Sequence, residues 1–243
     1  MGKLDDKVAI ITGASHGLGR GIALAFAGEG ASVVVAARNA AQLQDAADEI
    51  QSHGGVALAV PTDLSDETQI ENLFARTMER FGRLDVLVNN AASLEGGPID
   101  ALASDVWNRA IAVNLTAPFL CTRAAFRIMK PQGGGRIVNV ASIAAQRVRP
   151  NSAPYAATKA GLWGLTQAAA LEGRAHGIVV SCIYPGNIRT ETRATPDNDF
   201  NREPMMSVAE VAAGVLFIAA QPPHLNVLEL LMLPTEQAYL GRG

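Results

Sequence analysis

The chain has 243 residues, 49% of them hydrophobic and 18% charged, and a formal net charge of −3. This composition supports a large core rather than disorder, and the length fits one α/β domain over residues 1–243. The balanced charge, without runs of one sign, excludes nucleic acid and anionic membranes as expected partners. No secretory signal and no apolar run long enough to span a bilayer is recognised, so we expect a cytoplasmic protein.

The first predicted strand, residues 7–12, is a continuous apolar run that leads into a glycine-rich turn. Gly13, Gly17 and Gly19 have the spacing G-x-x-x-G-x-G, and a helical pattern follows. This order places backbone N–H groups and the positive end of a helix against a pyrophosphate, where a Cβ would obstruct the approach. The turn therefore favours a nucleotide site, although the spacing alone also fits a structural turn.

The second predicted strand, residues 32–36, is followed by Ala37 and Arg38. In an NAD site, an acidic side chain at the end of this strand receives the ribose hydroxyls. An uncharged residue followed by a guanidinium can instead accept a 2′-phosphate. Arg38 thus favours NADP and leaves NAD possible, and the alternative is that Arg38 is a solvated surface residue.

The next elements alternate between helix and strand. They are helices at 40–52 and 66–81 and strands at 56–60 and 85–88. Asp63 follows one of these strands, where it fits a turn residue or a contact to the edge of an adenine about equally well. Asn89 and Asn90 follow the next strand and are suited to satisfying loop backbone groups, a role compatible with forming one wall of a cofactor cleft.

Residues 104–130 read as one long helix that contains Asn114 and Pro118. A proline lacks its own N–H and clashes with the carbonyl four residues back, which here belongs to Asn114. We expect a bend that leaves the Asn114 carbonyl free to hold a water. The alternative is that Asn114 is only a polar residue tolerated at a kink.

A strand at 136–140 leads to Ser142, and a helix predicted at 155–175 presents Tyr155 and Lys159 on one face, one turn apart. The free phenol has a pKa of about 10, and a neighbouring cation lowers it by favouring the phenolate. A hydroxyl, a phenol and an ammonium at the end of a strand can bind a carbonyl oxygen and give it a proton. An isolated Y-x-x-x-K is more often an ordinary solvated pair, so the nucleotide turn decides its meaning.

The remaining chain continues the alternation with strands at 178–184 and 227–233 and a helix at 207–220. Residues 187–206 are polar and weakly patterned, as expected of a substrate loop. The alternation predicts a Rossmann-type doubly wound parallel sheet of about seven strands, with helices on both faces. Cys121 and Cys182 read as buried free thiols, and the scattered histidines give no metal site.

With these residues in view, the chain resembles the classical short-chain dehydrogenase/reductase family over nearly its whole length. The motifs that carry the resemblance are T-G-x-x-x-G-x-G from Thr12, Asp63-Leu64, Asn89-Asn90-Ala91, Asn114, Ser142, Y-x-x-x-K from Tyr155, and P-G-x-I-x-T from Pro185. Each motif alone is weak, and their occurrence together in the family's order is specific.

The resemblance implies a catalytic set. Tyr155 would be the acid in reduction and the base in oxidation, and Lys159 would lower its pKa and hold the nicotinamide ribose. Ser142 would hydrogen-bond the substrate oxygen, and Asn114 would hold a water in a proton relay. The other motif positions would bind NADP: Gly13, Ser15, Gly17 and Leu18 at phosphates and ribose, Arg38 at the 2′-phosphate, Asp63 and Leu64 beside adenine, Asn90 at the adjoining ribose, and Pro185, Gly186, Ile188 and Thr190 in the turn at the nicotinamide.

The resemblance also implies an NADP(H)-dependent oxidoreductase that interconverts a carbonyl and a secondary alcohol. Such proteins are usually homotetramers or dimers built on the helices at 104–130 and 155–175. The alternatives are an NAD-linked alcohol or sugar dehydrogenase and a nucleotide-binding regulatory protein without turnover. Three departures stand out: Ala92 where the family has Gly, His16 where NADP enzymes often have a basic residue, and residues 233–236 where many relatives have a glycine pair.

Overall fold

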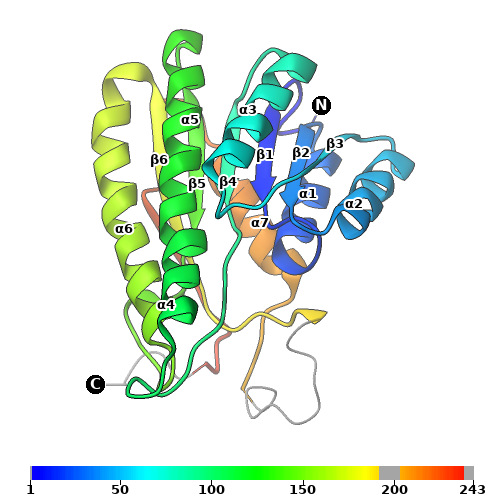
Figure 1. Ribbon diagram of the computed structural model, residues 1–243. Coiled ribbons are helices and arrows are strands. Elements are labelled where there is room, and N and C mark those ends of the chain that lie inside the picture. Colours follow the sequence, from blue (N-terminus) through cyan, green and yellow to red (C-terminus); the bar gives the residue numbers. More distant parts are fainter. Residues whose placement is uncertain (1, 192–202, 238–243) are drawn as a thin grey trace.

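A computed structural model describes residues 2–191 and 203–237 (Figure 1). Within these residues, seven strands form one sheet in the order β3-β2-β1-β4-β5-β6-β7. The strands are β1 (Val8–Thr12), β2 (Ser32–Ala37), β3 (Val56–Pro61), β4 (Val86–Asn89), β5 (Gly135–Val140), β6 (Ile178–Pro185) and β7 (Glu229–Met232). Every neighbouring pair is parallel, which confirms the expected doubly wound sheet.

Helices cover both faces of the sheet. They are α1 (Gly17–Gly28), α2 (Ala40–Ser52), α3 (Glu67–Phe81), α4 (Ser104–Ile111), α5 (Ala117–Gln132), α6 (Ala153–Gly173) and α7 (Val208–Ala219). Helices α1, α2 and α7 contribute to the hydrophobic cluster on one face, and α3, α5 and α6 contribute to the cluster on the other. The strand order reverses between β1 and β4, which makes this the switch point where ligands bind in such sheets.

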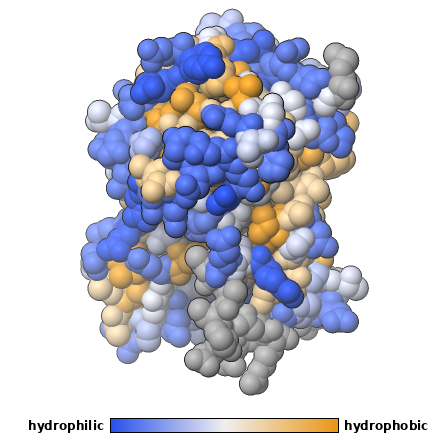
Figure 2. All heavy atoms as spheres, turned by 90° about the vertical axis from the view of Figure 1, so that its right-hand side faces the viewer, coloured by the Kyte–Doolittle hydropathy of each residue, from blue (hydrophilic) through white to orange (hydrophobic). Residues whose placement is uncertain are grey.

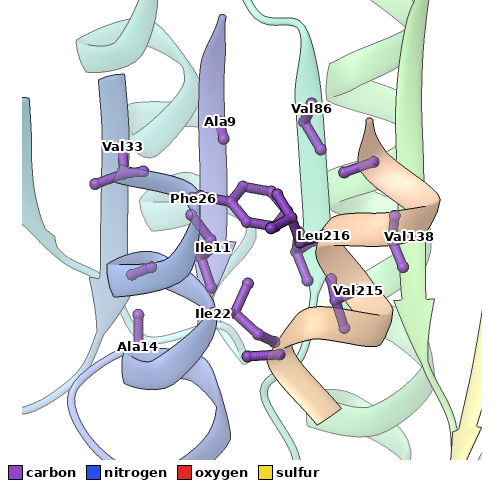
Figure 3. Close-up of a cluster of buried hydrophobic side chains, with 14 of the residues drawn as sticks. Ala9, Ile11, Ala14, Ile22, Phe26, Val33, Val86, Val138, Val215 and Leu216 are labelled. Atoms are coloured by element: carbon purple, nitrogen blue, oxygen red, sulfur yellow. The ribbon is translucent and has the colours of Figure 1, made fainter. Parts of the chain in front are cut away.

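The core on the first face is built where α1 meets α7 over the central strands. Figure 3 shows Phe26 and Ile22 of α1 pointing toward Leu216 and Val215 of α7. The residues of β1 are all buried because helices cover both of its faces, which explains its continuous apolar sequence. This packing holds the glycine turn after β1 in a fixed position relative to the sheet.

The predicted single helix at 104–130 is wrong in one respect, because a π-helical segment, Ala112–Thr116, separates α4 from α5. Pro118 has no N–H to donate to the carbonyl of Asn114, four residues back. The neighbouring N–H of Ala117 donates instead to the carbonyl of Ala112, five residues back. The chain thus widens for one turn, as π-bulges do inside longer helices.

Several element boundaries differ from the predicted ones by about two residues. Helix α6 begins at Ala153 rather than at Tyr155, with Pro154 in its first turn. Strand β7 begins at Glu229 rather than at residue 227. Helix α7 begins at Val208, one residue after the predicted start, because Ser207 is its N-cap and forms a reciprocal capping box with Glu210. Of the predicted substrate loop at 187–206, residues 192–202 lie outside the described residues.

Figure 2 turns the right-hand side of Figure 1, on which α2 lies, toward the reader. Hydrophilic side chains cover most of this face, and apolar side chains form separate patches. This surface matches the amphipathic pattern of α2, whose buried residues are Leu43, Ala46, Ala47 and Ile50. Over residues 2–191 and 203–237, no helix combines the length and the apolar character that a membrane crossing requires.

Candidate active site

A cleft of about 1070 Å³ lies at the carboxyl ends of the strands, beside the glycine turn. In Figure 1 this is the lower end of the molecule, toward which the strand arrows point and where α4 lies. Of the predicted cofactor residues, those that line the cleft are Gly13, Ser15, Gly17, Leu18, Arg38, Asp63, Leu64, Asn90 and Thr190. The fold thus brings together motif residues that are as far apart in the sequence as Gly13 and Thr190.

The glycine turn is a cradle that side chains would fill. Gly13 has a φ of +68°, and a Cβ there would lie 2.8 Å from the Ala91 Cα. A Cβ on Gly19 would collide with the Gly13 carbonyl. Gly17 has a φ of +55°, which favours glycine, and a Cβ there would only make ordinary contact with the Thr190 Cγ2 at 3.6 Å. The turn is therefore shaped for close approach of a ligand to backbone N–H groups at the start of α1, which suits a pyrophosphate.

Asn90 connects the part of the cleft that follows β4 to the glycine turn that follows β1. Its Nδ2 donates to the Thr12 carbonyl at 2.8 Å, and its backbone N–H donates to the Thr12 Oγ1 at 3.0 Å. One residue earlier, at the end of β4, the Asn89 Nδ2 donates to the Asn139 Oδ1 at 2.8 Å and joins β4 to β5. Both roles considered for the paired asparagines are thus present, because Asn90 is a structural tie and lines the cleft.

The part of the cleft next to β2 and β3 is lined by Arg38 and Asp63, which follow these strands. The Asp63 Oδ1 accepts hydrogen bonds from the Ser65 hydroxyl at 2.7 Å and the Ser65 N–H at 2.9 Å. These bonds, with a smaller contribution from the Arg38 charge, hold the pKa of Asp63 below its usual value. Asp63 is therefore a turn residue that also faces the cleft as a carboxylate.

Tyr155, Lys159 and Ser142 are not among the residues that line the cleft, and they lie where β5 ends and α6 begins. The Lys159 side chain is 2% exposed, its Nζ donates to the Val140 carbonyl at 2.7 Å, and it lies 5.6 Å from the centroid of the Tyr155 ring. Burial lowers the pKa of Lys159 from 10.5 to about 8. The Ser142 Oγ accepts from the Ala144 N–H at 3.2 Å and so caps the short 3₁₀ turn after β5.

The Asn114 side chain lies in the π-helical segment and is buried among structural partners. Its Oδ1 accepts from the Ser93 N–H at 2.6 Å. Its Nδ2 donates to the Ser93 carbonyl at 2.9 Å and to the Thr158 Oγ1 at 3.2 Å. The amide therefore ties the loop after β4 to α6, next to Tyr155 and Lys159. A water held by Asn114 stays a prediction and concerns its backbone carbonyl.

The predicted nicotinamide residues lie in the turn that follows β6. Thr190 lines the cleft, and Ile188 pairs with Met206 in an isolated β-bridge. Pro185 ends β6 opposite Met232, and the Gly186 N–H donates to the Met232 carbonyl at 2.8 Å. Neither Pro185, Gly186 nor Ile188 lines the cleft. This turn therefore reaches the cleft through Thr190, beside Gly17 of the glycine turn.

Sequence reasoning missed several residues that line the cleft. They are Asn39, Gln42, Arg109 and Val113. The stretch after Asn90 continues the wall, and Glu95 forms a salt bridge of 3.0 Å with Arg109 of α4. Val113 directly precedes Asn114, which was the one available signal. Arg109 offered none, since its pairing with Glu95 joins two separate elements.

Replacing Gly19 with Ala is expected to disrupt the glycine turn, because the new methyl group would collide with the Gly13 carbonyl. We expect a loss of nucleotide binding of at least about tenfold, together with lower stability. Gly28→Ala is the matched control, since a Cβ at this exposed position of α1 meets no atom within 4 Å. Calorimetric nucleotide titration and thermal unfolding of both variants check this, and equal binding by both would contradict the cradle.

The fold and the site together define a nucleotide-dependent oxidoreductase of the Rossmann type. The glycine cradle, the cleft at the switch point and the adjacent phenol and ammonium all belong to that class. Among the described residues, no group of three or more His, Cys, Asp or Glu side chains could hold a metal ion.

The chain belongs to the short chain dehydrogenase family, whose model matches residues 7–200. A protein named 3-oxoacyl-(acyl-carrier-protein) reductase from Synechocystis sp. is 37% identical over 235 residues, which cover 91% of this chain and 92% of that protein. An uncharacterized oxidoreductase from Bacillus subtilis, YxjF, is 36% identical over 225 residues, which cover 92% of this chain and 88% of that protein.

Solved structures agree with this membership. A short chain dehydrogenase from Burkholderia cenocepacia, in complex with NADP, superposes with a TM-score of 0.87 at 33% identity and covers 95% of this chain and 97% of its own. A metagenomic short-chain oxidoreductase, also in complex with NADP, gives a TM-score of 0.85 at 35% identity, with 96% and 99% coverage.

Proposed function

We propose that the protein is an NADP(H)-dependent oxidoreductase that interconverts a ketone or other carbonyl compound and a secondary alcohol. The observation that carries this proposal is the buried Lys159 ammonium, held by the Val140 carbonyl 5.6 Å from the Tyr155 ring. Burying a cation costs free energy unless the charge is paired or hydrogen-bonded. Its position one turn from a phenol and beside Ser142 supports proton transfer at a substrate oxygen.

In the proposed mechanism, the cofactor supplies or accepts a hydride at the substrate carbon. Tyr155 donates a proton to the carbonyl oxygen in reduction and takes it back in oxidation. Lys159 stabilises the negative charge of the Tyr155 phenolate, and this makes the phenol a better proton donor near neutral pH. Ser142 would hydrogen-bond the substrate oxygen. The Asn114 carbonyl would hold a water in a proton relay that returns a proton to Tyr155.

For the cofactor, the glycine cradle would take the pyrophosphate, with Ser15 and Leu18 beside it. Asp63, Leu64 and Asn90 would hold the adenosine half, and the turn from Pro185 to Thr190 the nicotinamide. Arg38 would accept the 2′-phosphate, with His16 nearby in the cleft lining. The NADP bound to two structural relatives supports this cofactor.

Replacing Arg38 with Ala is expected to weaken NADPH binding about 10- to 100-fold and to leave NADH binding nearly unchanged, because only NADPH carries the 2′-phosphate. Calorimetric titration with both nucleotides measures this. Arg76→Ala is the matched control, because Arg76 is an exposed residue of α3 that pairs with Glu79 at 3.3 Å. If the wild-type protein prefers NADH, Arg38 is a surface residue and the NAD-linked alcohol or sugar dehydrogenase takes precedence.

The name of one relative bears on the substrate class. The Synechocystis protein is named for reduction of a 3-oxoacyl thioester, which is a ketone reduction of the proposed kind. We propose that this chain acts as a cytoplasmic carbonyl reductase in a homotetramer or homodimer. Exposed apolar side chains on the helices next to the site support self-association: Trp107 of α4, Phe119 of α5 and Leu171 of α6. A nucleotide-binding protein without turnover would have no need of the buried Lys159.

A further inference from the structure

Asn187, in the turn after β6, makes three hydrogen bonds to two other segments of the chain, residues 203–206 and the segment after β7. Its backbone N–H donates to the Gln237 Oε1 at 2.9 Å. Its carbonyl accepts from the Met206 N–H at 2.9 Å, and its Nδ2 donates to the Glu203 Oε2 at 2.6 Å. The residue is 4% exposed and its bond to Gln237 is shielded from water, whereas the Glu203 carboxylate is partly exposed. A buried backbone N–H or amide that loses such a partner is costly.

Gln237 comes from the segment after β7, which departs from the family's glycine pair. Its side chain is 7% exposed. The Oε1 atom packs so closely on the turn that a Cβ on Gly186 would collide with it. The carboxyl-terminal segment therefore rests directly on the turn, and glycine at position 186 makes that contact possible.

Glu203 connects the same turn to the segment that leads into α6. Its Oε2 lies 2.6 Å from the Arg149 guanidinium, and Arg149 stands between Ser142 and Tyr155. The turn continues through the Arg189 N–H, which donates to the Met206 carbonyl at 2.8 Å, to Thr190 at the cleft. The position of Thr190 is thus mechanically linked to both Gln237 and Glu203.

We propose that Asn187, Glu203 and Gln237 form a positioning cluster that fixes the turn after β6 and, through it, the nicotinamide half of the cofactor relative to Tyr155. This inference rests on the proposed function and deepens it. None of the three residues reaches the cleft lining. They are positioning residues, and their effect is confined to the end of the cofactor that the turn holds.

The test compares two ligands on the variant Gln237→Leu, which keeps the side-chain volume and removes the acceptor. NADPH contains the nicotinamide, whereas adenosine 2′,5′-bisphosphate has only the adenosine half. We expect NADPH affinity to fall about tenfold because the Asn187 N–H loses its partner, with bisphosphate affinity unchanged. Gln44→Leu is the matched control, since Gln44 is exposed on α2 and pairs only with Asp48 among the hydrogen bonds of the described residues. It should leave both affinities unchanged.

A second pair of variants keeps the inference testable if Gln237→Leu does not fold. Glu203→Gln retains an oxygen that accepts from the Asn187 amide, and Glu203→Leu does not. We expect the first to keep NADPH affinity and the second to lose it selectively. Equal losses for NADPH and the bisphosphate, or no loss in any variant, would overturn the positioning cluster. A wild-type protein that binds neither ligand would instead refute the proposed function, so the two failures are distinguishable.

Discussion

Replacing Tyr155 with Phe is expected to lower the turnover number by about 10²- to 10⁴-fold, the usual contribution of a positioned acid or base. The variant keeps the ring that lies 5.6 Å from the Lys159 Nζ and removes only the phenolic hydroxyl. NADPH affinity should stay within about twofold, because the lost hydroxyl acts on the substrate oxygen rather than on the phosphates. Steady-state rates with a panel of ketones and calorimetric NADPH titration measure the two effects separately.

Tyr184→Phe is the matched control for this experiment. Tyr184 is 2% exposed in the cluster with Trp163 and Leu162, and it does not line the cleft. Removing its hydroxyl should leave turnover unchanged. Full turnover in Tyr155→Phe would show that another group transfers the proton and would remove the basis of the proposed mechanism.

Replacing Lys159 with Met is expected to stabilise the folded protein at pH 7 while lowering turnover at least about 100-fold. The pKa of Lys159 falls from 10.5 in the unfolded chain to about 8 in the folded chain because burial penalises the cation. A shift of this size corresponds to a cost of roughly 3 kcal/mol in the folding free energy of the wild-type protein. Replacing Lys159 removes this cost but also loses the bond to the Val140 carbonyl, which stabilises the fold by about 1 kcal/mol. We therefore expect a net gain of about 1–2 kcal/mol in the free energy of unfolding.

The pH dependence of the stability difference between wild type and Lys159→Met tests whether burial of the Lys159 charge causes it. Below pH 8 both states of the wild-type chain carry the Lys159 proton, and the full cost of burial is present. Between pH 8 and 10.5 the unfolded chain binds more protons than the folded chain, so wild-type stability rises relative to that of the variant. Urea denaturation at pH 7 and at pH 10 should show a smaller gain at the higher pH. Lys130→Met, at an exposed lysine of α5, should show no gain at either pH. A Lys159→Met protein less stable than wild type at pH 7 would mean that the Val140 bond outweighs burial.

Sequence periodicity predicted the sheet because its inner strands, β1, β2, β4, β5 and β6, are buried on both faces and read as short apolar runs. The same local character explains the N-cap at Ser207 and the end of α2 at His53 and Gly54, which depend on neighbouring residues only. The π-helical segment escaped prediction, although Pro118 indicated a disturbance. A proline removes one hydrogen bond, and the surrounding packing decides whether the helix bends or widens.

The site was predictable where a motif encodes backbone geometry, as in the glycine turn and the spacing of Tyr155 and Lys159. It was not predictable where function depends on pairs distant in sequence. Glu95 and Arg109 line the cleft as a pair, and Gln237 contacts a residue 50 positions earlier. Nothing in the local sequence of either partner specifies the other, since such contacts follow from the assembled sheet.

The order of the strands also governs how the protein is made. β1 pairs with β2 early, at Val8 with Ser32, but its other edge waits for β4, where Ala9 pairs with Val86. During synthesis the apolar edge of β1 therefore stays open until the chain has emerged well beyond Val86, and then β5 and β6 must add in turn. Such nonlocal parallel pairing is slow and exposes strand edges to aggregation. Nascent chains that end between β3 and β4 should consequently need the help of a chaperone to stay soluble.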